Sequence, residues 1–395
     1  MCRDGRYTPF ANSQLYLYLP LMTILNYIIW NQSPEIYSIG TFALRWYGLF
    51  FALGFLISQQ ILYYIYKKEG KPEKDVDTLT IYMVIATIIG ARLGHVIFYQ
   101  PEIIFENPIS IFLPFELNPF RFTGLQGLAS HGGAIGILFA LWLYSRKKKP
   151  GQSYFQVVDR IVILVALTGA LIRLGNFFNS EIIGLPTDKP YGVAFVSEFK
   201  ESITDKRIDR DQIVESVVVK KNDSIPKGSN GRVPINIYLF FKNGVSKSQA
   251  DNLTNYTARN ILANSLHEHF DASGENTRIS VAEQSDGTFA SRISTFGVAR
   301  HAAQLYESIS CVILFIFLYW LWSKEKENLP PGRLLGIFLI WCFGLRFFFE
   351  FLKENQEAFE DGMILNMGQI LSIPLVIAGV IILTLSFKKE KKQPN

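Results

Sequence analysis

Paired cysteines and clusters of metal ligands are both missing from this sequence. Its three cysteines are Cys2, Cys311 and Cys342. The last two lie in apolar stretches and none lies in the long polar segment, so we expect no disulfide framework. His267 and His269 form an HEH pair, but no third ligand follows at a spacing that zinc uses. The sequence therefore predicts neither a metal ion nor another cofactor.

Charge is nearly absent from several long stretches of the chain. Of the 395 residues, 49% are apolar and 14% aromatic, and the apolar residues are gathered into blocks, which excludes an ordinary soluble protein. About 20 apolar residues suffice to cross a hydrocarbon core of roughly 30 Å. Seven stretches fit this length: 46–66, 77–99, 128–145, 154–174, 302–322, 333–352 and 367–387. The predicted fold class is an all-α polytopic membrane protein with seven transmembrane helices.

Alternate short loops lack lysine and arginine. The loops KKEGKPEKD, SRKKKPG and SKEKENLPPGR and the tail FKKEKK are basic, whereas the two short loops on the other side contain only Arg121 and Lys353. The positive-inside rule then predicts the N-terminus outside and the C-terminus in the cytoplasm. The net charge of +5 arises mostly from these basic loops, so we expect no nucleic-acid partner.

The first thirty residues lack the cleavage site of a signal peptide. The apolar segment LYLYLPLMTILNYIIW is short and contains Pro20. An eighth span would put basic loops on both sides of the membrane, so we expect an interfacial segment instead. Met22 is then the expected natural start, with residues 1–21 as an upstream extension.

From about Lys200 to Arg292 the apolar blocks give way to charged and polar loops. INIYLFF and RISVAE suit strands, and the stretch after Ser246 has helical length and a start signal. We expect a small α+β extracytoplasmic insert. The predicted domains are an N-terminal extension with the interfacial segment (1–39), transmembrane helices 1–4 with the start of an outer head region (40–199), the insert (200–297) and transmembrane helices 5–7 (298–395).

Polar residues inside the predicted spans invite a functional reading, because a charge there costs at least roughly 2.5–3.5 kcal/mol. In GARLGHVIFYQ, Gly90 and Gly94 have a spacing that lets helices approach closely, and Arg92 and His95 lie near the outer half of the same span. Packing with a snorkelling arginine explains this block as well as a functional site does. In HGGAIG, His131 lies near the expected membrane surface, where a structural histidine and a general base are equally good interpretations.

The stretch RLGNFFNSE ends the fourth predicted span with polar residues. On a helix, Arg173, Asn176, Phe177 and Ser180 share one face, and Glu181 lies one step beyond. The guanidinium and the amide would therefore converge at the outer surface. The alternative is a self-contained salt bridge between Arg173 and Glu181.

A second arginine occurs in the sixth predicted span. In GLRFFFEFLKENQ, Arg346 and Glu350 form an i, i+4 pair, which alone would indicate a structural ion pair. Together with Arg173, however, Arg346 places a second guanidinium at outward depth on a different helix. The pair predicts a clamp on an anion, and phospholipid phosphate is the anion that abounds there.

These blocks resemble the family of bacterial phosphatidylglycerol:prolipoprotein diacylglyceryl transferases over nearly the whole chain outside the insert. Three positions depart from the family pattern: His95 replaces a common tyrosine, Ile172 a common glycine, and HAAQ the usual HPSQ. The insert exceeds the usual head domain, so the resemblance does not cover its role. The matching motifs, in family order, are IGTFALRWYG, GARLGHVIFY, HGGAIG, RLGNFFNSEIIGLPTD, RHAAQLYE, LRFFFEFLKENQ and MGQILSIP.

The resemblance implies a multi-pass enzyme of the bacterial cytoplasmic (inner) membrane with its active site toward the outer leaflet. It would transfer the diacylglyceryl group of phosphatidylglycerol to the lipobox cysteine of prolipoprotein signal peptides, forming a thioether and releasing glycerol phosphate. This is the first step of lipoprotein maturation. The functional residues carried over by motif are Tyr47, His131, Arg173, Asn176, Glu181, Gly184, Arg346 and Glu350.

The chemistry divides these residues by role. A thiol of ordinary pKa near 8.5 must be ionised, which we assign to His131, and charge growing on phosphate must be neutralised, which we assign to Arg173 and Arg346. The leaving phosphate carries a stable charge of its own, so the reaction requires no metal. The remaining residues are expected to bind and orient substrate: Tyr47, Asn176, Glu181, Gly184 and Glu350.

Two other classes of protein fit parts of the pattern. A transporter for an anionic substrate would also place arginines and glycines in its spans, but it predicts matching halves. The sequence has no second copy of HGGAIG or RLGNFFNSE. A scaffold anchored by its spans would not need polar residues at the outer ends of several of them.

Overall fold

The computed structural model describes residues 27–39, 42–106, 111, 115–117, 120–122, 129–273, 276–354, 360 and 362–390. They form two compact units. The sheet unit combines the described residues up to Trp46 with Asn176–Gln304 and Leu352–Glu354, and the helical unit holds the others. The expected start at Met22 and the upstream extension lie outside the described residues.

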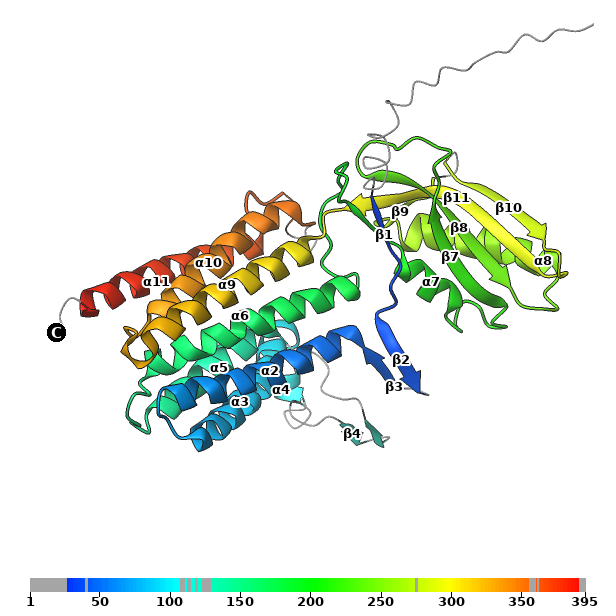
Figure 1. The fold of residues 1–395 in the computed structure, drawn as a ribbon. Helices are drawn as coiled ribbons and strands as arrows, with labels where there is room; N and C mark the ends of the chain where they lie inside the picture. The colour runs from blue at the N-terminus through cyan, green and yellow to red at the C-terminus, as the bar shows by residue number, and fades with distance from the viewer. Residues whose placement is uncertain are drawn as a thin grey trace, which may run out of the picture. The chain divides into compact units, whose positions relative to one another are not determined.

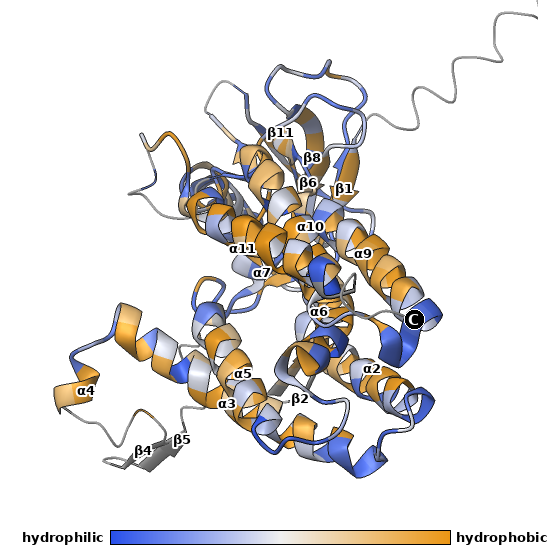
Figure 2. Cartoon of the chain, turned by 90° about the vertical axis from the view of Figure 1, so that its left-hand side faces the viewer, coloured by the Kyte–Doolittle hydropathy of each residue, from blue (hydrophilic) through white to orange (hydrophobic). Residues whose placement is uncertain are grey.

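The helical unit is built mainly from long helices (Figure 1). Figure 2 shows apolar residues along these helices and hydrophilic residues mainly near their ends. Short 3₁₀ turns follow two of them, η4 (Lys326–Asn328) and η5 (Glu350–Leu352), and β4 (Phe115–Leu117) pairs with β5 (Phe120–Phe122). The helices are α2 (Trp46–Lys68), α3 (Glu73–Tyr99), α4 (Ile103–Glu106), α5 (Ser130–Ser145), α6 (Tyr154–Phe178), α9 (Ala303–Glu325), α10 (Arg333–Phe349) and α11 (Met367–Glu390).

Six helices in the described part of the chain are long and apolar enough to cross a membrane. They are α2, α3, α6, α9, α10 and α11, which confirms a polytopic membrane protein and six of the seven predicted stretches. The third predicted stretch, 128–145, contains α5, which is apolar but only 16 residues long. A seventh span therefore stays a prediction.

Glycines let α3 and α5 lie against each other. A Cβ atom added to Gly90 would come within 2.5 Å of the Gly132 carbonyl oxygen, and one added to Gly94 within 2.7 Å of the Gly132 Cα. On α5, a Cβ at Gly136 would lie 2.5 Å from the Ala86 oxygen. No side chain fits such a contact, so the close helix packing predicted from the glycine spacing is confirmed.

α6 is the most enclosed apolar helix of the unit. Half of its apolar window is buried, against 28% or less for the other five spanning-length helices. Its inward residues, such as Val158 and Ile163, pack with Leu314 of α9 and Leu334 of α10 in one apolar core. A central helix is a rigid support for a functional side chain at its end, and α6 carries Arg173.

The sheet unit contains a seven-stranded sheet, so the all-α description is too narrow for this chain. The main path runs β1–β6–β11–β8–β7, with β9 and β10 also paired to β11; β1 and β6 are parallel and the other pairs antiparallel. The strands are β1 (Ile28–Trp30), β6 (Val193–Phe195), β7 (Val214–Lys221), β8 (Arg232–Phe241), β9 (Phe270–Asp271), β10 (Arg278–Glu283) and β11 (Phe289–Arg300).

The end of the predicted interfacial segment forms a strand, and its location at a membrane surface stays a prediction. Its last residues, Ile28–Trp30, form β1, whose backbone pairs with β6. Tyr27 directly before β1 is buried and donates its hydroxyl to the Pro234 carbonyl at 2.6 Å. The apolar character of these residues thus serves a protein core, which composition alone does not distinguish from a membrane surface.

Elements predicted within the insert are confirmed. INIYLFF lies in β8 and RISVAE is β10. Ser246 caps α8 (Lys247–Asn252) through a capping box with Gln249, and the helical stretch continues through η2 (Leu253–Ala258) and η3 (Ile261–Ser265). The unit also contains α7 (Ser197–Thr204) and a hairpin of β2 (Glu35–Ile39) and β3 (Phe42–Arg45).

Candidate active site

Arg173 near the end of α6 is paired with a carboxylate of α9. Its Nε lies 2.5 Å from Glu307 Oε2, and both side chains are largely buried. One turn earlier, the Ser308 hydroxyl donates to the Ala170 carbonyl at 2.9 Å, which fixes α9 against α6. The alternative of a self-contained pair with Glu181 therefore gives way to a cross-helix pair that the sequence analysis did not foresee.

Arg346 near the end of α10 forms the predicted i, i+4 pair. Its Nε lies 3.5 Å from Glu350 Oε1, and about a third of its side chain is exposed (35%). Glu350 itself is buried and accepts a hydrogen bond from Asn366 Nδ2 at 3.3 Å. Gly368 lies so close that a Cβ there would come within 2.7 Å of the Glu350 carboxyl carbon. Glu350 is thus held from α11, and Arg346 keeps an accessible guanidinium.

Both arginines lie near Cys342. This cysteine is one turn before Arg346 on α10, and the charged groups of Arg346, Glu307 and Arg173 are all close enough to its thiol to affect it electrostatically. Its thiol also lies near that of Cys311 on α9. The ends of α6, α9 and α10 therefore gather two guanidiniums in one region, each with a carboxylate beside it. Such a group can bind an anion, and each guanidinium still has a carboxylate beside it when no anion is bound.

Tyr47 belongs to the same unit. It is the second residue of α2 and lies against Gly175 of α6, where a Cβ would come within 3.0 Å of the Tyr47 ring. Gly175 is two residues beyond Arg173, so the start of α2 is fixed beside the arginine end of α6.

His131 is placed differently from these residues. It is the second residue of α5 and is exposed, directly before the glycine contact with α3. In the part of the chain that the structure describes, His131 has no hydrogen bond or ion pair to either arginine. The structure therefore does not join His131 to the arginine group.

In the sheet unit, Asn176 and Glu181 contact each other. Asn176 Nδ2 donates to Glu181 Oε2 at 3.2 Å, Asn179 Nδ2 donates to Oε1 at 3.1 Å, and the Glu181 amide donates to the Asn176 carbonyl. Ser180 and Ile182 both have positive φ angles, 57° and 56°. A β-branched residue rarely adopts this conformation, so the turn that holds Glu181 is strained.

Gly184 is required by its surroundings. Its amide donates to the His301 carbonyl at 3.0 Å, and its own carbonyl accepts from Arg300 Nη1 at 3.1 Å. A Cβ here would lie 2.5 Å from the His301 oxygen and 2.7 Å from the Leu352 oxygen. The backbone of three segments meets at this glycine, which by itself requires glycine at this position.

Gly184→Ala is expected to lower the thermal stability of the protein and its folded yield, because backbone atoms cannot yield to a methyl group. Overpacking of this kind typically costs about 1–3 kcal/mol. Thermal unfolding in detergent measures the loss. Gly48→Ala is the matched control, since a Cβ there meets nothing within 4 Å. An unchanged melting temperature for Gly184→Ala would show that the segments separate freely.

Sequence reasoning missed three residues around the site. Glu307 lies inside the predicted span 302–322, so the rule that intramembrane charges are functional would have found it. Gln304 is buried and donates to the Glu181 carbonyl at 2.5 Å, and it belongs to the motif RHAAQLYE. Asn366 precedes a span as an ordinary polar residue, and no sequence signal distinguishes it.

Comparisons with known proteins agree with the motif resemblance. A family model described as prolipoprotein diacylglyceryl transferase matches residues 34–385. Similar curated proteins, each named phosphatidylglycerol–prolipoprotein diacylglyceryl transferase, come from Tolumonas auensis (31% identity, 92% of this chain and 100% of the relative), Chloroherpeton thalassium (32%, 94% and 98%) and Bacteroides fragilis (32%, 92% and 96%). With a match this long, the chain belongs to the prolipoprotein diacylglyceryl transferase family.

Proposed function

We propose that the protein transfers the diacylglyceryl group of phosphatidylglycerol to the lipobox cysteine thiol of prolipoproteins, the first step of lipoprotein maturation. The single observation that carries the proposal is that the Arg173–Glu307 pair and Arg346, from three apolar helices, all lie near the Cys342 thiol. Phosphate is the anion that two guanidiniums recognise best at a membrane surface. The names of the relatives supply the two substrates.

The reaction balances without a cofactor. The sulfur of the lipobox cysteine attacks the glycerol carbon that bears the phosphate, a carbon–sulfur bond forms, and the carbon–oxygen bond breaks. The electron pair of that bond stays on the oxygen of the departing glycerol phosphate, and the thiol proton passes to a base. Arg173 and Arg346 neutralise the charge that grows on the phosphate. Glu307 and Glu350 orient the two guanidiniums.

In this proposal Tyr47, Asn176 and Glu181 bind and orient substrate, and Gly184 supports them. Tyr47 is fixed against Gly175 beside Arg173. Asn176 and Glu181 present an amide and a carboxylate that restrain each other, and such polar groups can bind the glycerol hydroxyls of the headgroup. Gly184 maintains the backbone around the Glu181 turn.

His131 is the proposed base for the thiol. A general base typically contributes about 10²–10⁴-fold to the rate. His131→Asn should therefore lower transfer about 100-fold near pH 7, and the deficit should shrink toward pH 9, where thiols of pKa about 8.5 ionise unaided. Rates measured across this pH range with a lipobox peptide give the comparison.

His301→Asn is the matched control for the base. Burial and the nearby Lys189 ammonium lower the pKa of His301, and its backbone carbonyl accepts a hydrogen bond from the Gly184 amide. We expect the His301 variant to keep the wild-type pH profile. If His131→Asn kept the wild-type dependence of the transfer rate on pH, His131 would not be the base. The same would follow if His301→Asn, rather than His131→Asn, lost the fall in rate toward low pH.

We further propose seven spans, with α5 as the seventh, in the bacterial inner membrane. The basic loops then lie in the cytoplasm, and the arginine ends of α6 and α10 face the outer leaflet. The insert at 200–297 is extracytoplasmic in this arrangement. The proposed domains keep the division at residues 39, 199 and 297.

Purified protein in lipid nanodiscs with labelled phosphatidylglycerol and a lipobox peptide tests the function. We expect the peptide to gain the mass of one diacylglyceryl group on cysteine, and a Cys→Ser peptide to gain none. Uptake of an anion by vesicles without peptide modification would instead favour the transporter.

A further inference from the structure

Two adjacent charged residues near the start of α6 are almost completely buried. Asp159 is 0% and Arg160 1% exposed. Both lie in the apolar core of the helical unit, at the opposite end of α6 from Arg173. The reaction proposed above uses neither of them. Charges in such a place persist only where their hydrogen bonds are well satisfied.

Asp159 caps the start of α10. Its Oδ2 accepts a hydrogen bond from the Gly332 amide at 2.7 Å, and its Oδ1 accepts one from the Leu335 amide at 2.8 Å. The N-cap position of α10 is Gly332, which has φ 91° and no side chain to bind these amides. A carboxylate from α6 therefore takes the place of the missing cap. These two hydrogen bonds to one carboxylate fix the position of α10 along the axis of α6.

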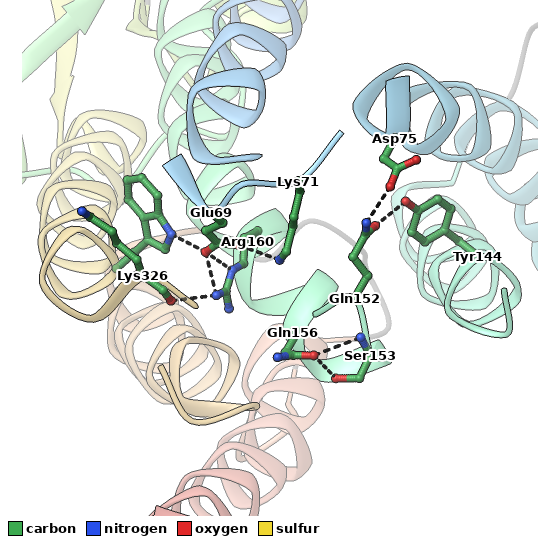
Figure 3. Close-up of polar contacts among 10 residues, drawn as sticks. Glu69, Lys71, Asp75, Tyr144, Gln152, Ser153, Gln156, Arg160 and Lys326 are labelled. Carbon is green, nitrogen blue, oxygen red and sulfur yellow. Dashed lines mark hydrogen bonds and ion pairs between the residues drawn. The ribbon is translucent and has the colours of Figure 1, made fainter. Parts of the chain in front are cut away.

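Arg160 makes the corresponding connection to α9 (Figure 3). Its Nε donates to Glu69 Oε1 at 2.9 Å, and the same oxygen accepts a hydrogen bond from Trp322 Nε1 at 2.7 Å. Arg160 Nη2 donates to the Lys326 carbonyl, directly after α9, at 2.8 Å. The end of α9 is thereby tied to α6 and to the turn after α2.

The same three helices carry the site at their other ends. Arg173 lies fourteen residues beyond Asp159 on α6, about 21 Å at 1.5 Å per residue. Arg346 lies eleven residues beyond Leu335 on α10, about 16 Å. α6 and α10 thus both run from the capped end toward the site. Because a helix is axially stiff, a shift of α10 at the cap displaces Arg346 relative to Arg173.

We infer that Asp159 is a positioning residue that sets the axial register of α10 on α6, so that Arg173 and Arg346 reach one phosphate. Arg160 and Glu69 do the same for α9 and its Glu307. The inference rests on the proposed function for its catalytic consequence. The register itself is a property of the fold and can be measured without any activity.

The catalytic test is Asp159→Asn beside Asp159→Glu. Asparagine offers one acceptor oxygen for two amides, and glutamate keeps both oxygens but places them one methylene further out. Misplacing a group by about 1 Å can cost about 100-fold in rate. We expect kcat to fall about 10- to 100-fold in both variants, with the KM for the peptide unchanged. A fully active Asp159→Glu would overturn the register role, because charge alone would then suffice.

Asp75→Asn is the matched control. Asp75 is also a buried acid (7% exposed) near a helix start, where it pairs with Lys149 and accepts from Gln152 Nε2 at 2.6 Å (Figure 3). It lies on α3, which carries neither arginine. We expect Asp75→Asn to lose stability but to retain kcat within about threefold, a change small beside the cost of a misplaced group. An equal fall in kcat for Asp75→Asn would show that general destabilisation explains the effect.

Thiol bridging reports the position of α10 relative to α9, which Arg160 ties to α6 independently of Asp159. Cys311 of α9 and Cys342 of α10 lie near each other, so dibromobimane should bridge them in a Cys2→Ser background. We expect slower bridging in Asp159→Asn and wild-type bridging in Asp75→Asn, both in folded protein purified by size exclusion. Wild-type bridging in Asp159→Asn would overturn the inference even if transfer were lost. If the wild-type protein had no transferase activity but Asp159→Asn still slowed bridging, the proposed function would be refuted and the register role of Asp159 would stand.

Discussion

Replacing Arg173 with alanine is expected to lower kcat/KM for lipid transfer by at least about 10³-fold, since an arginine that neutralises charge on a reacting phosphate typically contributes about 10³–10⁵-fold. The same change leaves Glu307 buried without its cation. Breaking a buried pair in this way typically costs about 3–5 kcal/mol of stability. Transfer is measured with labelled phosphatidylglycerol, and stability by thermal unfolding in detergent.

The double variant Arg173→Ala with Glu307→Gln separates the two effects. Removing the orphaned carboxylate should restore much of the stability without restoring transfer. If the double variant regained activity, Arg173 would serve only to neutralise Glu307. Arg173→Lys keeps the charge but loses the planar fork, so a full rate in that variant would argue against bidentate phosphate binding.

Replacing Arg346 with alanine is expected to lower transfer about 10²–10³-fold with little loss of stability. About a third of the Arg346 side chain is exposed (35%), and Glu350 keeps its hydrogen bond from Asn366 when the guanidinium is removed. Initial rates and melting temperatures of the purified variant check both statements. Arg146→Ala, an exposed arginine at the end of α5, is the control and should behave as wild type.

Combining the two alanine substitutions tests whether the arginines act on one group. Residues that act as a unit show strongly non-additive losses. The double variant should therefore be little slower than Arg173→Ala alone. Losses that multiply would mean that the two guanidiniums act on separate groups.

Patterns local in sequence predicted the helical part of the fold well. Apolar length identified the six spanning-length helices, and glycine spacing predicted the contact of α3 with α5. Both signals depend on residues a few positions apart. The sheet was foreseen only within the insert, because β1 pairs with β6 from far along the chain and its three residues look like part of a membrane-surface segment.

The sequence identified the charged residues of the site but not which carboxylate pairs with Arg173. Arg173 and Arg346 were evident as charges in apolar stretches, whereas the partner of Arg173 depends on which helix packs against α6. That helix is α9, from more than a hundred residues away, and it supplies Glu307. Asp159 likewise reads as a lone acid in a span until α10 is seen to begin against it.

A structure of the protein with phosphatidylglycerol bound tests the central claim most directly. The account predicts that nitrogen atoms of both Arg173 and Arg346 lie within about 3 Å of oxygens of the same phosphate, the distance of a charge-assisted hydrogen bond. A phosphate held by only one of these guanidiniums, with the other directed to a different lipid or to none, would contradict it.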